Sequence, residues 1–428
     1  MQKLDELLAI FMRVKAHPSL QNAAWTILEK VVAGFGVLLV TAYVARYIGP
    51  SLVGQLTMAA AVFQVVLVAA QLGSDSVLFK RVSRNAVSGA RLLSATTGLR
   101  LGVYLAISVP VLAFFLDGQG RVESVFFVAT CVAGFFAAWD VYSIYNNARL
   151  WSRVNAIANL IGLVCGLGSR YIIGAFKIDP VFLAFPIVMT AFVPFLIRYW
   201  IFRGEAGAKI SSFHVRRYSR HLLGAGGAVM ISAVAVALYT KIGQFVVFAV
   251  EGDRVMGVYS AALTIATSWA FVNVALINSF FPQIFAERDE NRALNMAARL
   301  GRYIAIICIC VTLLFYLFGE FAISLLFGPD FSGAYAPGVV LCLSVMFSAL
   351  GTISSRYVVR LSGYRYLLVK TLAVLCFSLL VYYPLVHFFG GLGGAIGVLL
   401  VELVSLTLMN YFFREGIVLR LHRRIVGV

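Results

Sequence analysis

The segment NAAWTILEKVVAGFGVLLVTAYVAR at residues 22–46 is apolar over most of its length and contains one Glu-Lys pair. An α-helix rises about 1.5 Å per residue, so about 20 to 25 such residues cross the roughly 30 Å of hydrocarbon in a bilayer. Further runs of this kind lie at 52–79, 92–116, 122–147, 154–174, 180–201, 222–249, 255–281, 300–319, 335–358, 366–389 and 391–413. The pattern predicts an all-α polytopic membrane protein with about 12 transmembrane helices.

The composition of the 428 residues agrees with a membrane protein. Hydrophobic residues make up 61% of the chain and charged residues 12%, whereas soluble domains are about half apolar and about a quarter charged. This composition excludes an ordinary soluble enzyme. All six cysteines lie inside apolar runs and none forms a Cys-x-x-Cys pair, so we expect neither disulfides nor a metal site.

The net charge of +17 is explained by membrane topology, because Lys and Arg are retained on the cytoplasmic side during insertion. Of the 35 basic residues, 27 fall in the N-terminal segment, the tail or alternate loops, and the opposite loops hold only Arg46, Arg121, Lys177 and Arg254. Both termini are therefore predicted to be cytoplasmic. Membrane lipids are the expected surroundings, and nucleic acid is not an expected partner.

The chain divides into two similar halves. Gly49-Pro50-Ser51-Leu52-Val53-Gly54 recurs 203 residues later as Gly252-Asp253-Arg254-Val255-Met256-Gly257, after equivalent runs. Each half has six runs, so a pseudo-two-fold axis along the membrane normal should relate two six-helix bundles around a central cavity. The predicted parts are an interfacial segment 1–21, a first bundle 22–202, a cytoplasmic linker 203–221, a second bundle 222–413 and a cytoplasmic tail 414–428.

Basic residues inside the spans are the first candidates for a binding site, because a charge in hydrocarbon costs about 2.5–3.5 kcal/mol on insertion scales. They are Lys30 in the first span, Arg170 in the fifth and Lys241 in the seventh. Together they could accept a phosphate or pyrophosphate. Lys30 could instead pair with a neighbouring helix, and Arg170 could snorkel to the outer headgroups.

Acidic residues in the spans are candidates for coupling or gating. Glu29 adjoins Lys30, and Asp75 and Asp140 lie near the cytoplasmic ends of their runs, where hydration or pairing with Lys80, Arg81 or Arg149 is the simpler interpretation. Glu402 lies near the middle of the last run, where it could exchange a proton or be buried against a polar neighbour.

Two kinds of chemistry find no support in the sequence. A membrane enzyme acting on lipid-linked sugars would usually carry acidic or His-rich motifs in a large external loop, and the predicted external loops are short. A Gly-rich loop ending in Lys-Ser or Lys-Thr, which ATP hydrolysis would require, is also absent from the sequence. Transport is therefore favoured over catalysis, with no cofactor and with coupling to a proton or cation gradient.

The segment WTILEKVVAGFGVLLVTAYVARYIGPSLVG at 25–54 resembles the opening of Wzx-type O-antigen and polysaccharide flippases. The resemblance continues through QLGSDSVLFKRVSR at 71–84, GVYSAALTI at 257–265, FFPQIFAE at 280–287 and GGLGGAIG at 390–397, and it covers nearly the whole chain. These flippases belong to the multidrug, oligosaccharidyl-lipid and polysaccharide exporter superfamily.

The resemblance implies that the protein moves an undecaprenyl-pyrophosphate-linked oligosaccharide, from O-antigen or another surface polysaccharide, across a bacterial inner membrane by alternating access. A polysaccharide polymerase and a chain-length regulator are the implied partners. Glu29, Lys30, Arg46 and Arg170 match family positions, and Arg46 thereby joins the predicted substrate-binding residues. Relatives often have an Asp beside the basic residue of the seventh helix, where this chain has Gly243. This departure weakens the coupling implied there.

Two other functions remain open at this stage. A drug or cation antiporter of the same architecture should centre on acidic residues in the first and seventh spans, and the seventh offers Lys241 without a carboxylate. A membrane-embedded polymerase or ligase is disfavoured by the short external loops. A lipid II flippase is a closer relative of the leading candidate, but such chains typically have more than twelve helices.

Overall fold

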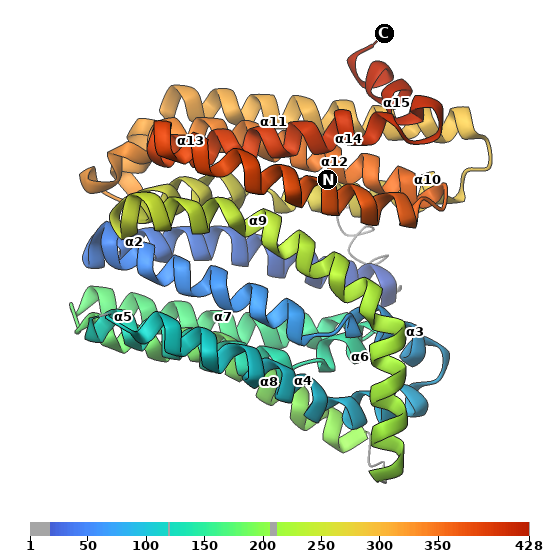
Figure 1. Cartoon of the computed structure of the whole chain (residues 1–428), viewed down its shortest axis with the longest axis horizontal. Helices are drawn as coiled ribbons and strands as arrows, with labels where there is room; N and C mark the ends of the chain where they lie inside the picture. Colours follow the sequence, from blue (N-terminus) through green and yellow to red (C-terminus); the bar gives the residue numbers. More distant parts are fainter. Residues whose placement is uncertain (1–17, 119, 206–211, 428) are drawn as a thin grey trace, which may run out of the picture. The chain divides into compact units, whose positions relative to one another are not determined.

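The computed structural model describes residues 18–118, 120–205 and 212–427, and in these ranges it contains helices and no strand (Figure 1). The α-helices are α2 Pro18–Ala70, α3 Ser74–Arg84, α4 Ala86–Leu116, α5 Arg121–Trp139, α6 Tyr142–Ala148, α7 Ser152–Ala175, α8 Ala184–Glu205, α9 Ser212–Ser268, α10 Phe271–Ala286, α11 Glu290–Leu326, α12 Tyr335–Arg360, α13 Tyr364–Leu406, α14 Leu408–Tyr411 and α15 Ile417–Val426. Short 3-10 helices are η1 Pro180–Leu183, η2 Pro329–Ala334 and η3 Arg414–Gly416. The predicted all-α class is confirmed. The predicted interfacial segment 1–21 lies almost entirely outside the described residues.

Glycine breaks explain how nine long helical segments correspond to twelve predicted crossings. Nine segments of the described chain are long and apolar enough to span a membrane, and three of these are long enough for two crossings: Glu29–Ala70, Val215–Ala286 and Tyr364–Tyr411. Each is broken at a glycine with positive φ, at Gly49 (78°), Gly252 (82°) and Gly390 (56°). Residues with a β-carbon rarely adopt such angles. All three breaks lie in the gaps predicted between consecutive runs.

The chain forms two compact units. Unit 1 comprises the residues up to Val37 together with Val62–Ala233, and unit 2 comprises Leu38–Ala61 together with the chain from Val234 onward. The turn around Gly49 thus belongs to unit 2, whereas the rest of α2 belongs to unit 1. The predicted division into bundles 22–202 and 222–413 places the whole segment 38–61 in the first bundle, whereas the structure groups it with unit 2.

Unit 1 is built on α4, α5, α7 and α8, in which α5 packs against α4 and α8, and α8 packs against α7. Aromatic side chains fill the space between α5, α6 and α8. The rings of Trp139 and Phe195 lie 5.0 Å apart, and those of Tyr142 and Phe202 lie 4.9 Å apart. This aromatic core fixes the ends of α5 and α8, where a polar network described below is located.

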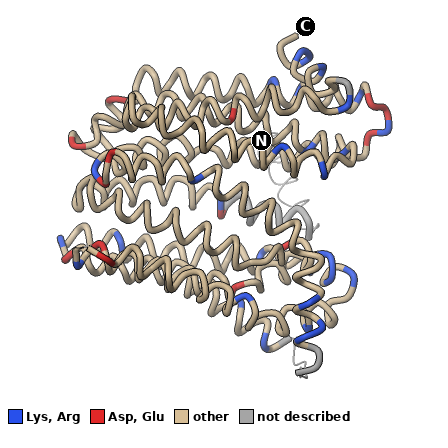
Figure 2. The backbone as a smooth tube through the Cα atoms, viewed as in Figure 1, with Lys and Arg blue, Asp and Glu red and all other residues tan. Residues whose placement is uncertain are grey.

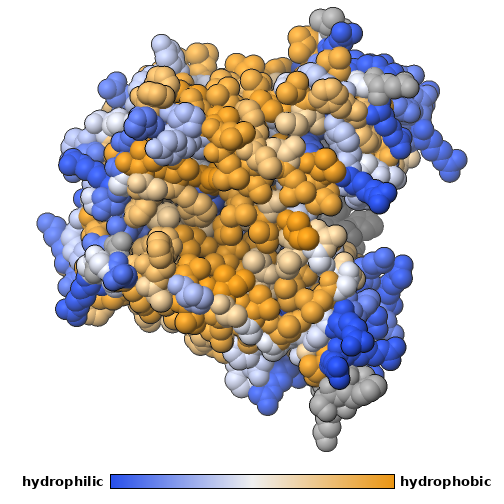
Figure 3. Space-filling model, viewed as in Figure 1, coloured by the Kyte–Doolittle hydropathy of each residue, from blue (hydrophilic) through white to orange (hydrophobic). Residues whose placement is uncertain are grey.

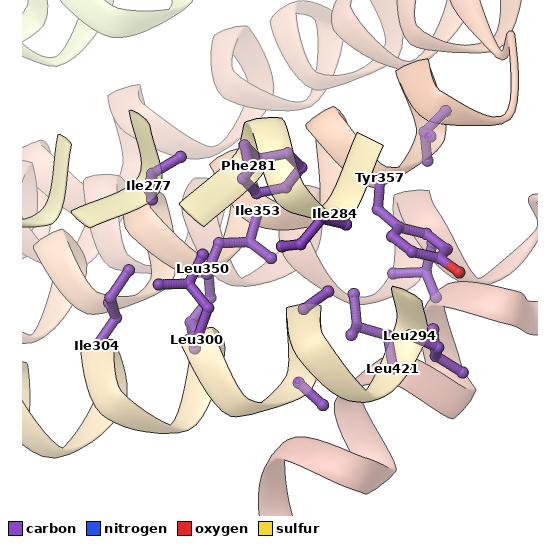
Figure 4. Packing of buried hydrophobic residues seen from close by; sticks show 14 of the residues in the cluster. Ile277, Phe281, Ile284, Leu294, Leu300, Ile304, Leu350, Ile353, Tyr357 and Leu421 are labelled. Atoms are coloured by element: carbon purple, nitrogen blue, oxygen red, sulfur yellow. The ribbon is translucent and has the colours of Figure 1, made fainter. Parts of the chain in front are cut away.

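Unit 2 has a core formed by α10, α11, α12 and the C-terminal helix α15 (Figure 4). Phe281 of α10 and Ile353 of α12 contribute fully buried side chains to it, together with Leu300 of α11 and Leu421 of α15. A second core joins α9, α11, α12 and α13 to residues of the 38–61 segment, including Ala42 and Ala45. The small residues of this segment allow its backbone to approach the helices of unit 2 closely.

The outward faces of the spanning helices are apolar, as a lipid environment requires. On α11 the exposed side chains include Leu313, Leu314, Leu317, Phe318 and Phe321. Figure 3 shows apolar side chains over the middle of the helices and polar side chains near their ends. In Figure 2, Lys and Arg are concentrated at the end of unit 1 that carries α3 and at the end of unit 2 that carries α15.

The repeated glycine motifs pack against each other within unit 2. A β-carbon built on Gly54 would collide with the backbone of Asp253, and one built on Gly257 would collide with the backbone of Pro50. The two copies of the motif therefore make reciprocal contacts, each glycine meeting the turn of the other copy. The internal repeat read from the sequence corresponds to a symmetric contact in space.

We predict that Gly54→Ala destabilises the protein by about 1–3 kcal/mol, because the added methyl group overpacks a backbone contact that cannot give way. Gly98→Ala is the matched control, since a β-carbon at Gly98 meets nothing within 4 Å and alanine is the better helix former. Thermal unfolding of the purified variants in mild detergent tests this. A Gly54→Ala variant as stable as Gly98→Ala would contradict the prediction.

The C-terminal helix α15 docks on α11 and α12 through a histidine and several basic side chains. The ring nitrogens of His422 lie 2.9 Å from the Ser354 hydroxyl and 3.2 Å from the Tyr411 hydroxyl. Arg302 donates hydrogen bonds to the carbonyl oxygens of Arg424 (2.8 Å) and Ile425 (3.2 Å). Burial, followed by the positive charge of Lys370, lowers the pKa of His422 to about 4.

We predict that acid weakens the docking of α15. The pKa of His422 is lower in the folded protein than its ordinary value of about 6.5, so the stabilisation is complete above pH 6.5 and is lost as the pH falls toward 4. Hydrogen exchange of the α15 amides, corrected for intrinsic rates, should lose protection by up to about tenfold per pH unit in this window. His422→Asn should remove the dependence, whereas exchange in the exposed-site control His221→Asn should keep it. A wild-type profile that is flat from pH 7 to 4 would refute this role.

Candidate functional site

A buried ion pair lies at the centre of the polar network of unit 1. Arg198 on α8 donates from Nε to both carboxylate oxygens of Asp140, at 3.1 and 2.9 Å, and from Nη2 to Oδ2. Both side chains are 7% exposed. A guanidinium that engages a carboxylate through two nitrogens is the strongest kind of protein ion pair, because its planar geometry matches that of the acid.

The network extends from this pair to the first spanning helix. Arg198 Nη1 donates to Asn159 Oδ1 at 2.7 Å, and Asn159 Nδ2 donates to Glu29 Oε1 at 2.7 Å. The side-chain amide of Asn159 thus accepts from Arg198 through its oxygen and donates to Glu29 through its nitrogen. Two of the four predicted coupling residues, Glu29 and Asp140, are therefore joined by one hydrogen-bonded chain that runs through α2, α7, α8 and the end of α5.

The partner predicted for Asp140 is wrong. The sequence suggested Lys80, Arg81 or Arg149, but the Arg81 guanidinium donates to Ser88 Oγ at 2.9 Å, and Arg149 lies over the Trp151 ring at 4.8 Å. Arg198 lies near the end of the predicted run 180–201, so the sequence pattern placed it with the basic residues of the cytoplasmic loop that follows. The helix continues to Glu205, so Arg198 lies within it and points into the bundle.

Asp75 also differs from its predicted position. Leu72 (φ 52°) and Gly73 (φ 65°) have left-handed backbones, which end the preceding helix, so Asp75 lies in the separate helix α3 rather than in the span predicted at 52–79. Desolvation raises the pKa of the Asp75 carboxyl, and Arg100 acts in the opposite direction. Arg100 is completely buried on α4 and donates to Thr96 Oγ1 at 3.0 Å.

The two predicted substrate cations of unit 1 are separated along its helices. Lys30 is exposed at the start of α2, next to the acid bound by Asn159. Arg170 lies eleven residues after Asn159 on α7, which is about 16 Å of helix rise. Arg170 is half-buried and has no hydrogen bond or ion pair with any described residue. The helix α7 therefore carries a polar group near one end and an unpaired cation near the other.

Arg46 has a structural role in unit 2. Its Nη2 donates to the carbonyl oxygens of Ser324, at 2.8 Å, and Leu325. These carbonyls belong to the last turn of α11, where the regular hydrogen-bonding pattern of the helix ends, and the Ser324 carbonyl also accepts from the backbone N–H of Gly328 at 3.1 Å. Arg46 thus caps a helix C-terminus, an arrangement that also suits the negative end of the helix dipole.

Lys241 lies on α9 in unit 2, half-buried, and no hydrogen bond or ion pair links it to a described residue. The structure explains why glycine stands two positions later. A β-carbon on Gly243 would lie 2.7 Å from Tyr382 Cε1, and one on Gly397 would lie 2.5 Å from the same ring. The buried Tyr382 ring fills this space, so a carboxylate at position 243 would require the ring to move.

Glu402, the fourth predicted coupling residue, is on α13 in unit 2. Its carboxylate accepts a hydrogen bond from the Ser348 hydroxyl of α12 and interacts electrostatically with Lys370. Lys370 is 8% exposed and lies inside the candidate span Tyr364–Tyr411, although its position near the start of the predicted run 366–389 had placed it with the basic residues of the preceding loop. Unit 2 therefore places a buried lysine within electrostatic range of a carboxylate in its spanning helices.

Comparison with protein families identifies the chain. The model of the family described as polysaccharide biosynthesis protein matches residues 19–288, more than half of the sequence. The chain belongs to this polysaccharide biosynthesis protein family. No match is found among curated proteins.

Solved structures of similar fold are transporters. An inward-facing multidrug resistance MATE family transporter of the MOP superfamily aligns with a TM-score of 0.66 at 15% identity, covering 93% of this chain and 99% of that one. An outward-facing structure of such a transporter gives 0.61 at 15% identity, with 96% and 98% covered. The Vibrio cholerae MATE transporter VcmN gives 0.62 at 13% identity, with 94% and 98% covered. This member of the polysaccharide biosynthesis protein family thus has the MATE transporter fold.

Several polar residues in the membrane-spanning helices of this protein were not among the predicted candidates. Arg198 and Arg356 lie in the last residues of the predicted runs 180–201 and 335–358, and Lys370 lies near the start of the run 366–389, so all three were counted with the basic residues of the adjoining loops. Arg100 stands eight positions inside the predicted run 92–116 and could have been found by the same search that found Lys241. Asn159 carries no charge, so its bridging role depends on the fold alone.

Proposed function

We propose that the protein is a flippase that moves an undecaprenyl-pyrophosphate-linked oligosaccharide from the cytoplasmic to the periplasmic leaflet of a bacterial inner membrane by alternating access. The observation that carries the proposal is the pair of cations in spanning helices, Arg170 and Lys241, that have no anionic partner among the described residues. Unpaired charges in hydrocarbon are retained for function. Membership of the polysaccharide biosynthesis protein family supports a saccharide cargo.

The proposed cargo-binding set is Lys30, Arg170 and Lys241. A pyrophosphate carries concentrated negative charge and needs positive partners in a path of low dielectric constant. We leave out Arg46, which matches a family position, because its guanidinium is engaged by the end of α11. Lys30 is retained because its side chain is exposed beside the unit 1 network.

A drug or cation antiporter is the second candidate, favoured by the fold of the multidrug transporters and by Glu29. The surroundings of Lys241 oppose it, because a β-carbon at position 243 would lie 2.7 Å from the Tyr382 ring, which occupies the space that a carboxylate there would need. A cationic substrate would thus meet an unpaired lysine where an acid is needed. The transporter fold also favours both candidates over a polymerase or ligase.

Coupling to a proton or cation gradient is proposed at the unit 1 network. A proton taken up by Asp140 would release Arg198 from its ion pair, and the change would reach Glu29 through Asn159. This hydrogen-bonded network thus links the protonation of Asp140, at the end of α5, to the packing of α2, α7 and α8. A polymerase and a chain-length regulator are the proposed downstream partners, and the proposed orientation has both termini in the cytoplasm.

Deletion of the gene in its own host tests the function. We expect surface polysaccharide to be lost and lipid-linked repeat units to accumulate in the cytoplasmic leaflet, with full recovery when the wild-type chain is expressed. Susceptibility to cationic drugs should not change. Normal polysaccharide together with drug accumulation in the deletion strain would favour the antiporter.

A further inference from the structure

Unit 2 contains a cavity of about 200 Å³ between the end of α9, α10 and α12. Pockets for drug-sized ligands are typically about 300–1,000 Å³, so this cavity suits a single small ring or headgroup. Its polar lining consists of Thr267, Asn273, Ser348, Thr352 and Arg356. Neither the predicted substrate-binding residues nor the predicted coupling residues line it.

Arg356 gives the cavity its charge. Its Nη2 donates to Asn278 Oδ1 at 2.7 Å, and its guanidinium lies over the Phe281 ring at 5.4 Å from the centroid. These two contacts hold the side chain in place, while most of its five N–H donors have no acceptor among the described residues. The lining contains no carboxylate. The cavity therefore selects for an anionic group at the Arg356 end.

The neutral groups of the lining present hydrogen-bond acceptors. Thr267 and Thr352 donate their hydroxyl hydrogens to carbonyl oxygens of their own helices, of Leu263 at 2.7 Å and Ser348 at 3.0 Å. Their oxygen lone pairs remain free to accept from a ligand. A ligand that carries several hydroxyl donors satisfies them.

Asn273 is 2% exposed, and both polar atoms of its amide face the Cys308 sulfur, Nδ2 at 3.5 Å and Oδ1 at 3.9 Å. A thiol is a weak donor and a weak acceptor, so a ligand hydroxyl is the stronger hydrogen-bond partner for this amide. The remaining lining includes Val274 and Ile277, which offer an apolar wall for the C–H face of a ring.

We propose that this cavity binds one monosaccharide unit that carries a carboxylate, with the acid on Arg356 and the ring hydroxyls on the threonines and Asn273. The inference rests on the proposed function, because it names the kind of sugar that the cargo contains. The Ser348 hydroxyl in the lining also donates to Glu402, which connects the cavity to the buried acid of unit 2.

Direct binding to the purified full-length protein tests the inference independently of transport. Titration calorimetry in detergent should show that glucuronic acid binds at least about tenfold more tightly than glucose or the methyl ester of glucuronic acid, because only the acid offers a charged acceptor to Arg356. Arg356→Gln should remove this preference, and Arg356→Lys should restore only part of it, since the lysine has no fork of donors.

Two further variants test whether the effect is specific to the cavity. Arg299→Gln, at an exposed position of α11, should bind glucuronic acid as the wild type does. Thr352→Val keeps the shape of the side chain and should weaken both glucuronic acid and glucose. The melting temperatures of all variants should match that of the wild type. If Arg356→Gln has a lower melting temperature, the binding of both sugars to Thr352→Val tests the site instead.

The outcomes separate this inference from the proposed function. Equal binding of the acid and its ester, or a preference that survives in Arg356→Gln, overturns the sugar site while leaving flippase activity to be measured on its own. Binding of short-chain phosphatidylglycerol without any binding of glucuronic acid identifies a lipid headgroup site and also overturns it.

Discussion

Replacing Arg198 by methionine should lower the free energy of unfolding by about 3–5 kcal/mol, because it leaves the Asp140 carboxylate buried without its partner. Methionine keeps much of the side-chain volume, so the loss reports the charge rather than a cavity. Asn159 also loses the donor that holds its carbonyl, which frees the amide bound to Glu29. Unfolding in mixed detergent–SDS micelles measures the effect.

The matched control is Arg203→Met, five residues further along α8 at an exposed position, which should change stability by no more than about 0.5 kcal/mol. The double variant Asp140→Leu with Arg198→Met should recover most of the lost stability, since a buried ion pair replaced by apolar groups is often neutral. If Arg198→Met is as stable as Arg203→Met, the pair is not buried as described.

Replacing Lys241 by alanine should reduce transport of the lipid-linked saccharide by about tenfold to a hundredfold while leaving the amount of protein in the membrane unchanged. A hydrogen bond to a charged group is worth about 1.5–3 kcal/mol, and each 1.4 kcal/mol is a factor of about ten. Among the described residues, Lys241 has no hydrogen-bond or ion-pair partner whose loss would damage the fold. Surface polysaccharide at native expression and transport in vesicles both report the change.

Lys241→Arg should retain most of the transport, because the charge is kept. Lys177→Ala, which removes an exposed lysine between α7 and η1, serves as the control and should behave as the wild type. Normal polysaccharide from the Lys241→Ala strain would remove this residue from the cargo path.

The arrangement of the helices could be predicted because hydrocarbon imposes length and composition on each crossing. The breaks at Gly49, Gly252 and Gly390 fall between predicted runs, and the first two occupy equivalent places in the repeat. The exchange of the 38–61 segment into unit 2 could not be predicted, because it depends on which helix faces touch.

The polar site was predicted less completely, for a physical reason. A charge search finds residues such as Glu29 and Lys241 in the middle of an apolar run, but a cation at the end of a run has the same pattern whether it faces headgroups or points inward. Arg198 and Lys370 lie inside the longer helices α8 and α13, and both side chains are buried. Hydrogen-bond partners such as Asn159 require the fold.

Transport of a lipid-linked saccharide across the bilayer can be measured with the purified protein. The most direct measurement uses proteoliposomes that contain a fluorescent oligosaccharide on polyisoprenyl pyrophosphate, with and without an imposed proton gradient, and a membrane-impermeant quencher outside. The account predicts that the purified protein makes the lipid of both leaflets accessible to the quencher, and that Lys241→Ala does so far more slowly. If only the lipid that started in the outer leaflet is quenched, while the same vesicles exchange a cationic drug for protons, the protein is an antiporter and the account is wrong.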